Sequence, residues 1–317
     1  MEALDPWAPA DPLGEALHFL RMNGAFYCRS ELSAPWGLTL PPMPGYMWFH
    51  VPISGEFLLE TPEEAEATLI RPGDFALVPH GEGHGLRSEV GAPAPGILDL
   101  EREHVSDRYE ILRHGGGGAP TTLICGAVRF DHPAARSLVE NLPAVIRVVV
   151  SGSPQLEWMR DTLRLMAAEA RELRPGGEAV ITRLADIMVV QAIRSWLESD
   201  PAARSGWLGA LQDRQIGRAI ALIHREPARP WTVAALAREL AMSRSAFAAR
   251  FTELVGEPVM QYVARWRMQL ALNSLRNEGA TVGELASQLG YRSEASFARA
   301  FKRVIGVPPG AVRRRLV

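Results

Sequence analysis

Residues 232–251 read TVAALARELAMSRSAFAARF, and residues 281–301 read TVGELASQLGYRSEASFARAF. The offset between the two copies is 49 residues before the turn and 50 after it, so one residue is inserted at the turn. In each copy a Thr suited to a helix N-cap precedes a Leu-Ala-x-x-Leu stripe, and a Ser suited to a second cap precedes an inward Phe pair at i and i+4. The repeat predicts two tandem helix-turn-helix units, joined by a helix over residues 259–276.

Charge is divided unevenly along the 317 residues. Residues 213–317 hold 17 Arg and Lys against 8 Asp and Glu, a net charge of +9, whereas residues 1–212 hold the remaining 17 and 28, a net charge of −11. A basic segment built from helix-turn-helix units indicates double-stranded DNA as the partner, because the second helix of each unit is shaped to enter the major groove.

The second unit has a polar outward face. If Phe297 and Phe301 are buried, Arg299 lies about 200° round the helix from Phe297 and points away from the core. Arg299 could form a fork with guanine O6 and N7, or it could contact a phosphate. The residues predicted to contact DNA in this unit are Glu294, Ser296, Arg299 and Lys302.

The first unit differs at the matching positions, since Ala249 stands where the second unit has Arg299. Its available donors are Arg244, Ser245 and Arg250, and Arg250 lies close to the buried face of the helix. This unit therefore either reads bases through methyl contacts or contributes mainly position and affinity.

Residues 216–314 resemble the DNA-binding domain of the AraC/XylS regulators. SEASFARAFKRVIGVPPGAVR, from Ser293, is close to the signature of that family's second unit, and YVARWRMQLALNSL, from Tyr262, matches its linking helix. The resemblance implies a one-component regulator that activates transcription more often than it represses it, with RNA polymerase as a further partner. A nucleoid-type DNA binder without an inducer is an alternative.

The first half of the chain predicts a β-sandwich or barrel. Residues 26–130 contain short apolar runs separated by Gly and Pro, and helical periodicity follows at residues 156–166 and 181–193 with a turn at 174–177. The expected fold class is α+β: a cupin-like jelly roll over residues 1–150, a helical hairpin and linker over 151–209, and an all-α DNA-binding domain over 210–317.

The front segment also resembles the cupin-type sensor domains found ahead of some AraC-type domains. GDFALVPHGEGH, at residues 73–84, fits the second cupin motif G(x)5PxGxxH, and His50 precedes Glu56 by six residues as in the first motif, although Pro52 replaces its second histidine. FYCRSELSAPWGL, from Phe26, and LICGAVRFDHP, from Leu123, extend the resemblance.

The cupin resemblance implies a divalent, Zn²⁺-like ion held by His50, His84 and Cys125, with Glu56 or His80 as further ligands. The alternative is a pocket without metal, in which His84 is a hydrogen-bonded core residue. The resemblance also implies a redox pair, because oxidant-responsive members, a reactive-chlorine regulator among them, have cysteines in places similar to Cys28 and Cys125. Here the alternative is two unrelated buried thiols. The effector is accordingly a small ligand, a metal or an oxidant.

Three further expectations complete the prediction. The apolar stripes at 156–166 and 181–193 exceed what one hairpin buries, which predicts a homodimer, although the stripes could instead pack wholly against their own barrel.

The N-terminus lacks a signal-peptide pattern, the apolar runs are too short to span a bilayer, and two cysteines make no disulfide framework, which indicates a cytoplasmic protein. A metal-dependent cupin enzyme such as a dioxygenase, with an accessory helical domain, is the alternative function.

Overall fold

The computed structural model describes residues 14, 17, 22–130, 135, 138–150, 157–172, 174–204, 206–277 and 280–314. Backbone contacts divide the chain into two compact units. The sheet unit comprises residues 20–130 and 139–199, and the helical unit comprises residues 200–317 with the short segments 1–19 and 131–138. The hairpin that we predicted as a separate segment thus belongs to the same compact unit as the barrel.

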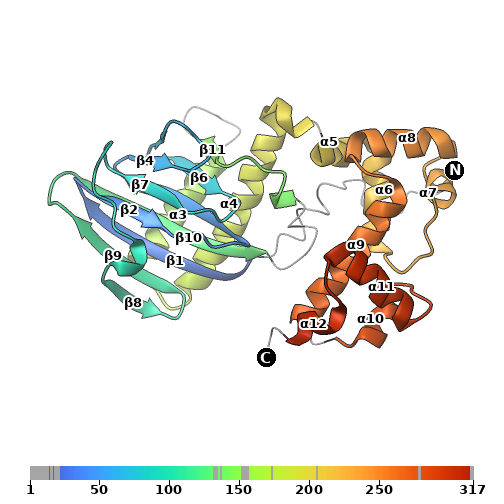
Figure 1. Ribbon diagram of the computed structural model, residues 1–317. Helices are drawn as coiled ribbons and strands as arrows, with labels where there is room; N and C mark the ends of the chain where they lie inside the picture. Colours follow the sequence, from blue (N-terminus) through green and yellow to red (C-terminus); the bar gives the residue numbers. More distant parts are fainter. Residues whose placement is uncertain are drawn as a thin grey trace. The chain divides into compact units, whose positions relative to one another are not determined.

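The described strands of the sheet unit form two sheets (Figure 1). One has seven strands in the order β11-β6-β3-β10-β1-β9-β8, and the other has four in the order β2-β7-β4-β5. Neighbouring strands pair antiparallel except β1 and β9, which are parallel. The strands are β1 (Met22–Ser33), β2 (Gly37–Leu40), β3 (Tyr46–Ser54), β4 (Phe57–Glu60), β5 (Thr68–Ile70), β6 (Asp74–Val78), β7 (His84–Arg87), β8 (Arg102–Ser106), β9 (Tyr109–Gly115), β10 (Pro120–Phe130) and β11 (Ile146–Val149), with a short 3-10 helix η1 (Ile97–Asp99) before β8.

The barrel interior lies between the two sheets. Successive side chains of a strand point to opposite faces, so Trp48 on β3 belongs to the buried cluster that both sheets share, while Phe49 packs against Tyr27 and Phe75 on the other face. The shared cluster takes Leu38 from β2 and Phe57 from β4 of the smaller sheet. This two-sheet enclosure confirms the predicted cupin-like fold.

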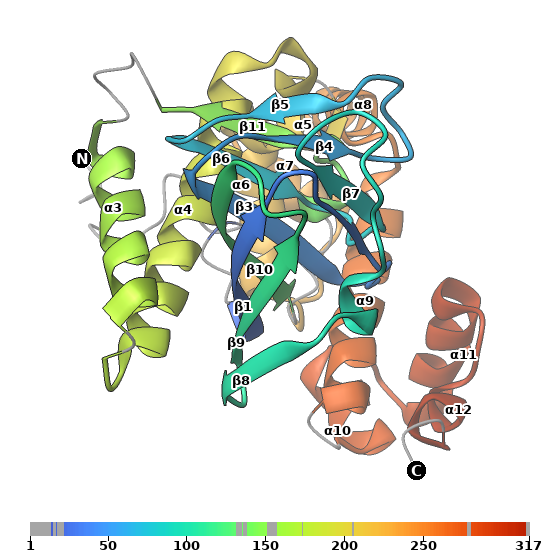
Figure 2. The same cartoon turned by 90° about the vertical axis from the view of Figure 1, so that its left-hand side faces the viewer.

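Helices α3 (Glu157–Glu172) and α4 (Gly177–Ser199) form the predicted hairpin (Figure 2). They contact one another, and they also contact β3, β6 and β11 of the larger sheet. Most positions of the two predicted stripes are buried in this packing: Met159, Leu163, Met166, Ile181 and Ile193. Leu156, the first position of the first stripe, lies outside the described residues.

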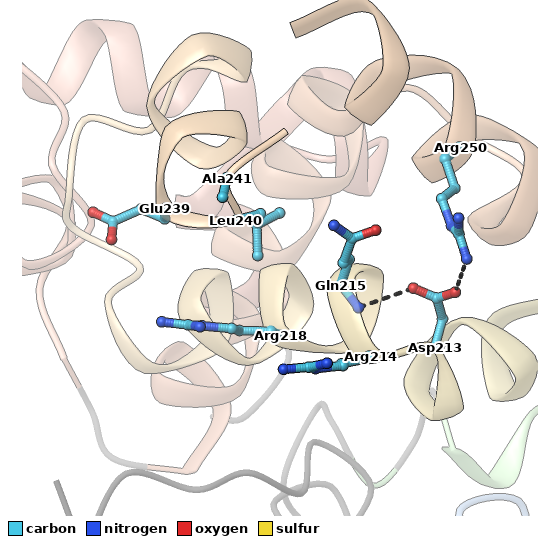
Figure 3. A pocket seen from close by; sticks show the side chains of 8 residues that line it. All are labelled: Asp213, Arg214, Gln215, Arg218, Glu239, Leu240, Ala241 and Arg250. Atoms are coloured by element: carbon cyan, nitrogen blue, oxygen red, sulfur yellow. Dashed lines mark hydrogen bonds and ion pairs between the residues drawn. The ribbon is translucent and has the colours of Figure 1, made fainter. Parts of the chain in front are cut away.

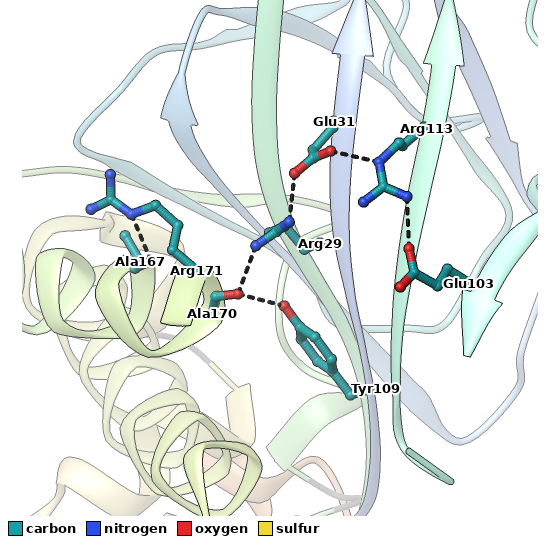
Figure 4. A network of polar contacts seen from close by, with 8 residues as sticks. All are labelled: Arg29, Glu31, Glu103, Tyr109, Arg113, Ala167, Ala170 and Arg171. Carbon is teal, nitrogen blue, oxygen red and sulfur yellow. Dashed lines mark hydrogen bonds and ion pairs between the residues drawn. The ribbon is translucent and has the colours of Figure 1, made fainter. Parts of the chain in front are cut away.

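The end of α3 is attached to the outer face of the larger sheet. The Ala170 carbonyl oxygen accepts hydrogen bonds from Arg29 Nη1 on β1 and from the Tyr109 hydroxyl on β9, each at 3.0 Å (Figure 4). The last carbonyls of a helix have no partner within the helix, so this contact satisfies an otherwise orphan group. Arg29 also donates to Glu31 at 2.6 Å, which holds the guanidinium in place.

The helical unit contains the predicted all-α domain. Its helices are η3 (Pro201–Arg204), α5 (Gly206–Gln212), α6 (Arg214–Arg225), α7 (Val233–Glu239), α8 (Arg244–Val255), α9 (Val259–Asn277), α10 (Val282–Gln288), α11 (Glu294–Ile305) and α12 (Pro309–Arg314). The end of the predicted linker, residues 206–209, is helical in α5, and Trp207 of α5 donates to the Tyr262 hydroxyl at 3.2 Å. None of the described helices is long and apolar enough to cross a membrane.

Candidate nucleic-acid interface and sensor site

Side-chain caps define both helix-turn-helix units, as the repeat predicted. Thr232 accepts from the Ala235 amide and Ser243 from the Ala246 amide, which cap α7 and α8. In the second unit Thr281 and Ser293 each form a capping box, which is the reciprocal version of the same contact. These hydrogen bonds fix where each recognition helix begins, and hence which side chains occupy its first turns.

The Phe pairs orient the recognition helices α8 and α11. The rings of Phe247 and Phe251 lie 5.7 Å apart and those of Phe297 and Phe301 lie 5.8 Å apart, and all four side chains are fully buried. Because the buried pair fixes the rotation of each helix about its axis, the residues on the opposite side are the ones that face solvent.

The outward face of α11 presents two cations. Arg299 and Lys302 are exposed, and neither has a hydrogen bond or ion pair with the residues that the structure describes. The hydroxyl of Ser296, also in the predicted set, bonds the Ser293 backbone within the capping box. Glu294 is exposed in the first turn and leans toward Gly283, where an added Cβ would lie 2.5 Å from its Oε1 atom.

Arg250 of α8, also predicted to contact DNA, has a partner within the protein. Its Nη2 atom lies 2.6 Å from Asp213 Oδ2, and Asp213 also caps α6 through the Gln215 and Ile216 amides (Figure 3). These contacts keep the pKa of Asp213 below its usual value, although burial opposes them. Arg250 therefore joins α8 to α6 through one of its nitrogens, and its contact with DNA stays a prediction. Arg244 and Ser245 remain exposed in the first turn of α8.

A pocket of about 540 Å³ lies beside this ion pair (Figure 3). Arg214 and Arg218 line it, one helical turn apart on α6, together with Arg250. Within the described part of the chain, Arg214 and Arg218 have no ion pair or hydrogen bond. Both residues precede the repeat and are not among the predicted site residues, although their i, i+4 spacing is visible in the sequence.

In the sheet unit, strand register places three predicted sensor residues in one row. Cys28 on β1 lies opposite Cys125 on β10, and Cys125 lies opposite His50 on β3. Side chains at such paired positions share a face of the sheet. His84 reaches the row from β7 of the other sheet, with its Nε2 atom 2.7 Å from His50 Nε2. The structure thus brings together Cys28, Cys125, His50 and His84.

Hydrogen bonds determine where the protons lie in this row. His84 Nδ1 is 3.1 Å from the Glu82 carbonyl oxygen, which can only accept, so His84 Nδ1 carries a proton and Nε2 is an acceptor. His50 Nε2 must then donate to His84, which leaves His50 Nδ1 to accept from the Cys125 thiol at 3.1 Å. His84, His50 and Cys125 each have a hydrogen-bond partner in their neutral forms.

Burial favours the same neutral state. It lowers the pKa of His84 to about 4 and holds that of His50 well below its usual range, with His84 contributing to the latter shift. Burial also raises the pKa of Cys28 to about 11 and that of Cys125 well above the ordinary thiol value. At neutral pH the row therefore consists of two thiols and two neutral imidazoles.

The donors are not arranged as the metal prediction requires. Cys125 approaches Nδ1 of His50 and His84 approaches Nε2, so the two lie at opposite nitrogens of one ring and do not converge on a common point. Glu56 is exposed and pairs with Arg71, and His80 bonds the Leu142 carbonyl, so neither joins the row. Among the described residues, no cluster of three or more His, Cys, Asp or Glu has metal-binding geometry.

Comparison with known proteins agrees with both halves of the chain. A Cupin family profile matches residues 11–198, and a helix-turn-helix domain profile matches residues 236–315. A putative AraC-like transcription regulator of Streptomyces lividans is 33% identical over 305 residues, which cover 96% of this chain and 98% of the relative.

Two more distant proteins are also similar. The RCS-specific HTH-type transcriptional activator RclR of Escherichia coli K12 is 27% identical over 84% of each chain. The DNA-binding domain of AdpA, solved in complex with a target DNA, is 28% identical and covers 31% of this chain and 89% of its own, with a TM-score of 0.30. Given the full-length relationship and the two domains, the chain belongs to the AraC-like transcription regulators that carry a cupin domain ahead of a helix-turn-helix DNA-binding domain.

Proposed function

We propose that this regulator is a cytoplasmic transcription activator, not an enzyme, which recognises one preferred DNA site and there contacts RNA polymerase. The observation that carries the proposal is the pair of exposed cations, Arg299 and Lys302, on the outward face of a helix whose rotation is fixed by buried rings. The E. coli relative RclR is a transcriptional activator, which supports the direction of control. The predicted metal ligands Cys125 and His84 contact opposite nitrogens of His50 and do not converge on one point, which argues against the dioxygenase alternative.

Selection of the full chain against random duplex oligonucleotides tests this proposal. We expect one enriched site, protected in a footprint and bound more tightly than its scrambled version. Equal protection along any duplex would instead identify a nucleoid-type binder. Transcription from a promoter that carries the selected site is expected to rise with the regulator present, and a fall would overturn the proposed activation.

Arg214 and Arg218 are expected to contact DNA phosphates, because they are unpaired cations beside the first recognition helix. Replacing both with alanine should weaken binding to specific and scrambled duplexes alike, and should reduce the slope of log affinity against log salt by about 2. Fluorescence anisotropy between low and moderate salt measures the slope. The same double replacement at Arg160 and Arg164 on α3 is the control, and an unchanged slope in the α6 variant would contradict the assignment.

We further propose that two copies pair through the α3–α4 hairpin. Each helix exposes two large apolar side chains seven residues apart, and residues at that spacing lie on one face: Trp158 and Leu165 on α3, Val180 and Ile187 on α4. Most of the two predicted stripes packs within the same chain, and only Ile187 of these four belongs to a stripe. The four exposed side chains are the ones left for a second copy.

Ile187→Glu is therefore expected to convert a dimer into a monomer in light scattering at tens of micromolar. Ile187 is 51% exposed, so the change does not disturb the core of its own chain. Leu98→Glu is the matched control, because Leu98 is 62% exposed on η1 of the same unit. A wild-type chain that is monomeric with and without DNA would contradict the proposed interface.

For the signal, we propose an oxidant that joins Cys28 to Cys125. Directly opposed cysteines on antiparallel strands support this more than the divergent donors support a metal. Hypochlorous acid would take two electrons from the two thiols, giving a disulfide, chloride, water and one proton, and His50 Nδ1 is placed to accept the proton of Cys125. The E. coli relative RclR is an RCS-specific activator, which supports the choice of oxidant.

Strand β1 offers a route from this pair to the hairpin. Cys28 belongs to the buried cluster between the sheets, whereas the neighbouring Arg29 bonds the end of α3 on the other face. Any shift of β1 that accompanies the disulfide would therefore act on the helices through the Ala170 carbonyl. The surrounding core is close-packed, which favours such transmission.

Mild hypochlorous acid is expected to remove both titratable thiols of the unfolded chain and to change its affinity for the selected site. Cys28→Ser and Cys125→Ser should each abolish the change in affinity, while Ser30→Ala, next to Cys28, should retain it. Metal content is measured on the same tag-free preparations. Stoichiometric metal that disappears in His84→Ala would overturn the redox proposal in favour of a metal site.

A further inference from the structure

The two recognition helices present different chemistry at matching positions. On the side opposite the buried rings, α11 carries Ala295, Arg299 and Lys302, and α8 carries Ser245, Ala249 and Thr252. The side chains of Ser245, Ala249 and Thr252 are all exposed. None is long enough to form the two-pronged hydrogen bond with a purine that an arginine or glutamine forms.

Thr252 does not supply a free hydroxyl to this face. Its Oγ1 atom donates to the Ala248 carbonyl at 2.9 Å, one turn earlier in the same helix. The hydroxyl proton is thereby used within the helix, so the side chain has no donor left for a base, and its Cγ2 methyl group is the apolar part that can contact one. Together with the Ala249 methyl group, it forms an apolar patch on the outward side of α8, beyond the polar first turn that holds Arg244 and Ser245.

We propose that the first unit selects thymine through the methyl groups of Ala249 and Thr252, while the second unit selects guanine through Arg299. Thymine is the base whose major-groove edge carries a methyl group, and alanine and threonine methyls are its usual apolar contacts. The inference rests on the proposed DNA recognition and deepens it. It makes the operator chemically asymmetric, with thymine essential in one half and guanine in the other.

Replacing thymine with uracil tests the proposal, because uracil lacks only the methyl group and pairs identically. Binding of the full chain to its selected site is measured after each thymine of the half-site under the first unit is replaced in turn. We expect affinity to fall about fourfold for each contacted methyl group. Uracil in the half-site under the second unit is the control and should leave affinity unchanged.

Two variants assign the contact to named atoms. Thr252→Ser keeps the hydroxyl that bonds Ala248 and removes the methyl group, so it should bind the thymine site about fourfold more weakly and no longer distinguish thymine from uracil at one position. Ala249→Arg gives the first unit the residue that Arg299 supplies in the second unit. Repeated selection should then return guanine in place of thymine at the base pair that this residue contacts.

The outcomes separate this inference from the proposed function. A selected site with full affinity for uracil throughout the first half would overturn the methyl contact and leave sequence-specific binding intact. Retention of thymine discrimination by Thr252→Ser, together with unchanged selection by Ala249→Arg, would overturn the residue assignment. Failure to select any site would contradict the proposed DNA recognition itself.

Discussion

Replacing Arg299 with alanine is expected to weaken binding to the selected site by about 1–3 kcal/mol, which is roughly a 5- to 150-fold loss of affinity. Arg299 is exposed on the outward face of α11 and has no described partner, so its guanidinium is available to guanine O6 and N7. Removing it should relax the preference at one base pair and leave the others unchanged. Fluorescence anisotropy with the selected site and its single-base variants measures both effects.

The pattern of the loss distinguishes base recognition from a phosphate contact. Arg164→Ala, an exposed arginine on α3 of the sheet unit, is the matched control and should bind all sites as the wild type does. Replacing the contacted guanine with 7-deazaguanine should reduce wild-type binding and have no effect on the alanine variant, because the analogue lacks the N7 acceptor. If Arg299→Ala lost equal affinity for every sequence, the residue would be a phosphate contact.

The second large effect concerns the turn of the second unit. Gly290 has a φ of +74°, and an added Cβ would lie 2.3 Å from the Ala228 backbone oxygen. Gly290→Ala is therefore expected to destabilise the helical unit by about 2–5 kcal/mol, since left-handed strain and the displaced backbone both contribute. Urea unfolding, followed by the indole signals of this unit, measures the change.

The first unit supplies its own control. Ala241 occupies the corresponding turn with a φ of 53°, so this turn already holds a Cβ in the left-handed region. Ala241→Gly should change stability by no more than about 1 kcal/mol, because relief of strain offsets the greater freedom of the unfolded chain. Equal and small effects at Gly290 and Ala241 would show that the contact with Ala228 does not constrain the second turn.

The architecture was predictable because its signals are local. The caps at Thr232 and Thr281 and the paired Phe rings depend on residues within a turn or two of one another, and all appear in the structure as the repeat indicated. The local motif at residues 73–84, which contains His84, likewise predicted the cupin fold. Periodicity did not reveal how much of each apolar stripe would be covered by the chain's own sheet.

The contacts among the predicted site residues are the part that the sequence does not show, for one common reason. The ion pair of Arg250 with Asp213 is not visible in the sequence, because Asp213 lies 37 residues away and the two meet only when α8 packs beside α6. The metal ligands were grouped by motif spacing, which does not show that Cys125 and His84 meet opposite nitrogens of His50. Contacts between side chains of different elements depend on how distant segments pack, so the pattern within one segment does not show them.

The sequence by itself determined that this protein has two helix-turn-helix units behind a cupin domain, since caps, turns and hydrophobic spacing act over a few residues. Tertiary structure alone decided that Cys28, Cys125 and His50 share one row, because strand register arises from the pairing of β1, β10 and β3. It also decided which cations remain unpaired beside the recognition helices. Local propensity selects the elements, whereas packing between elements selects which side chains meet and which face solvent.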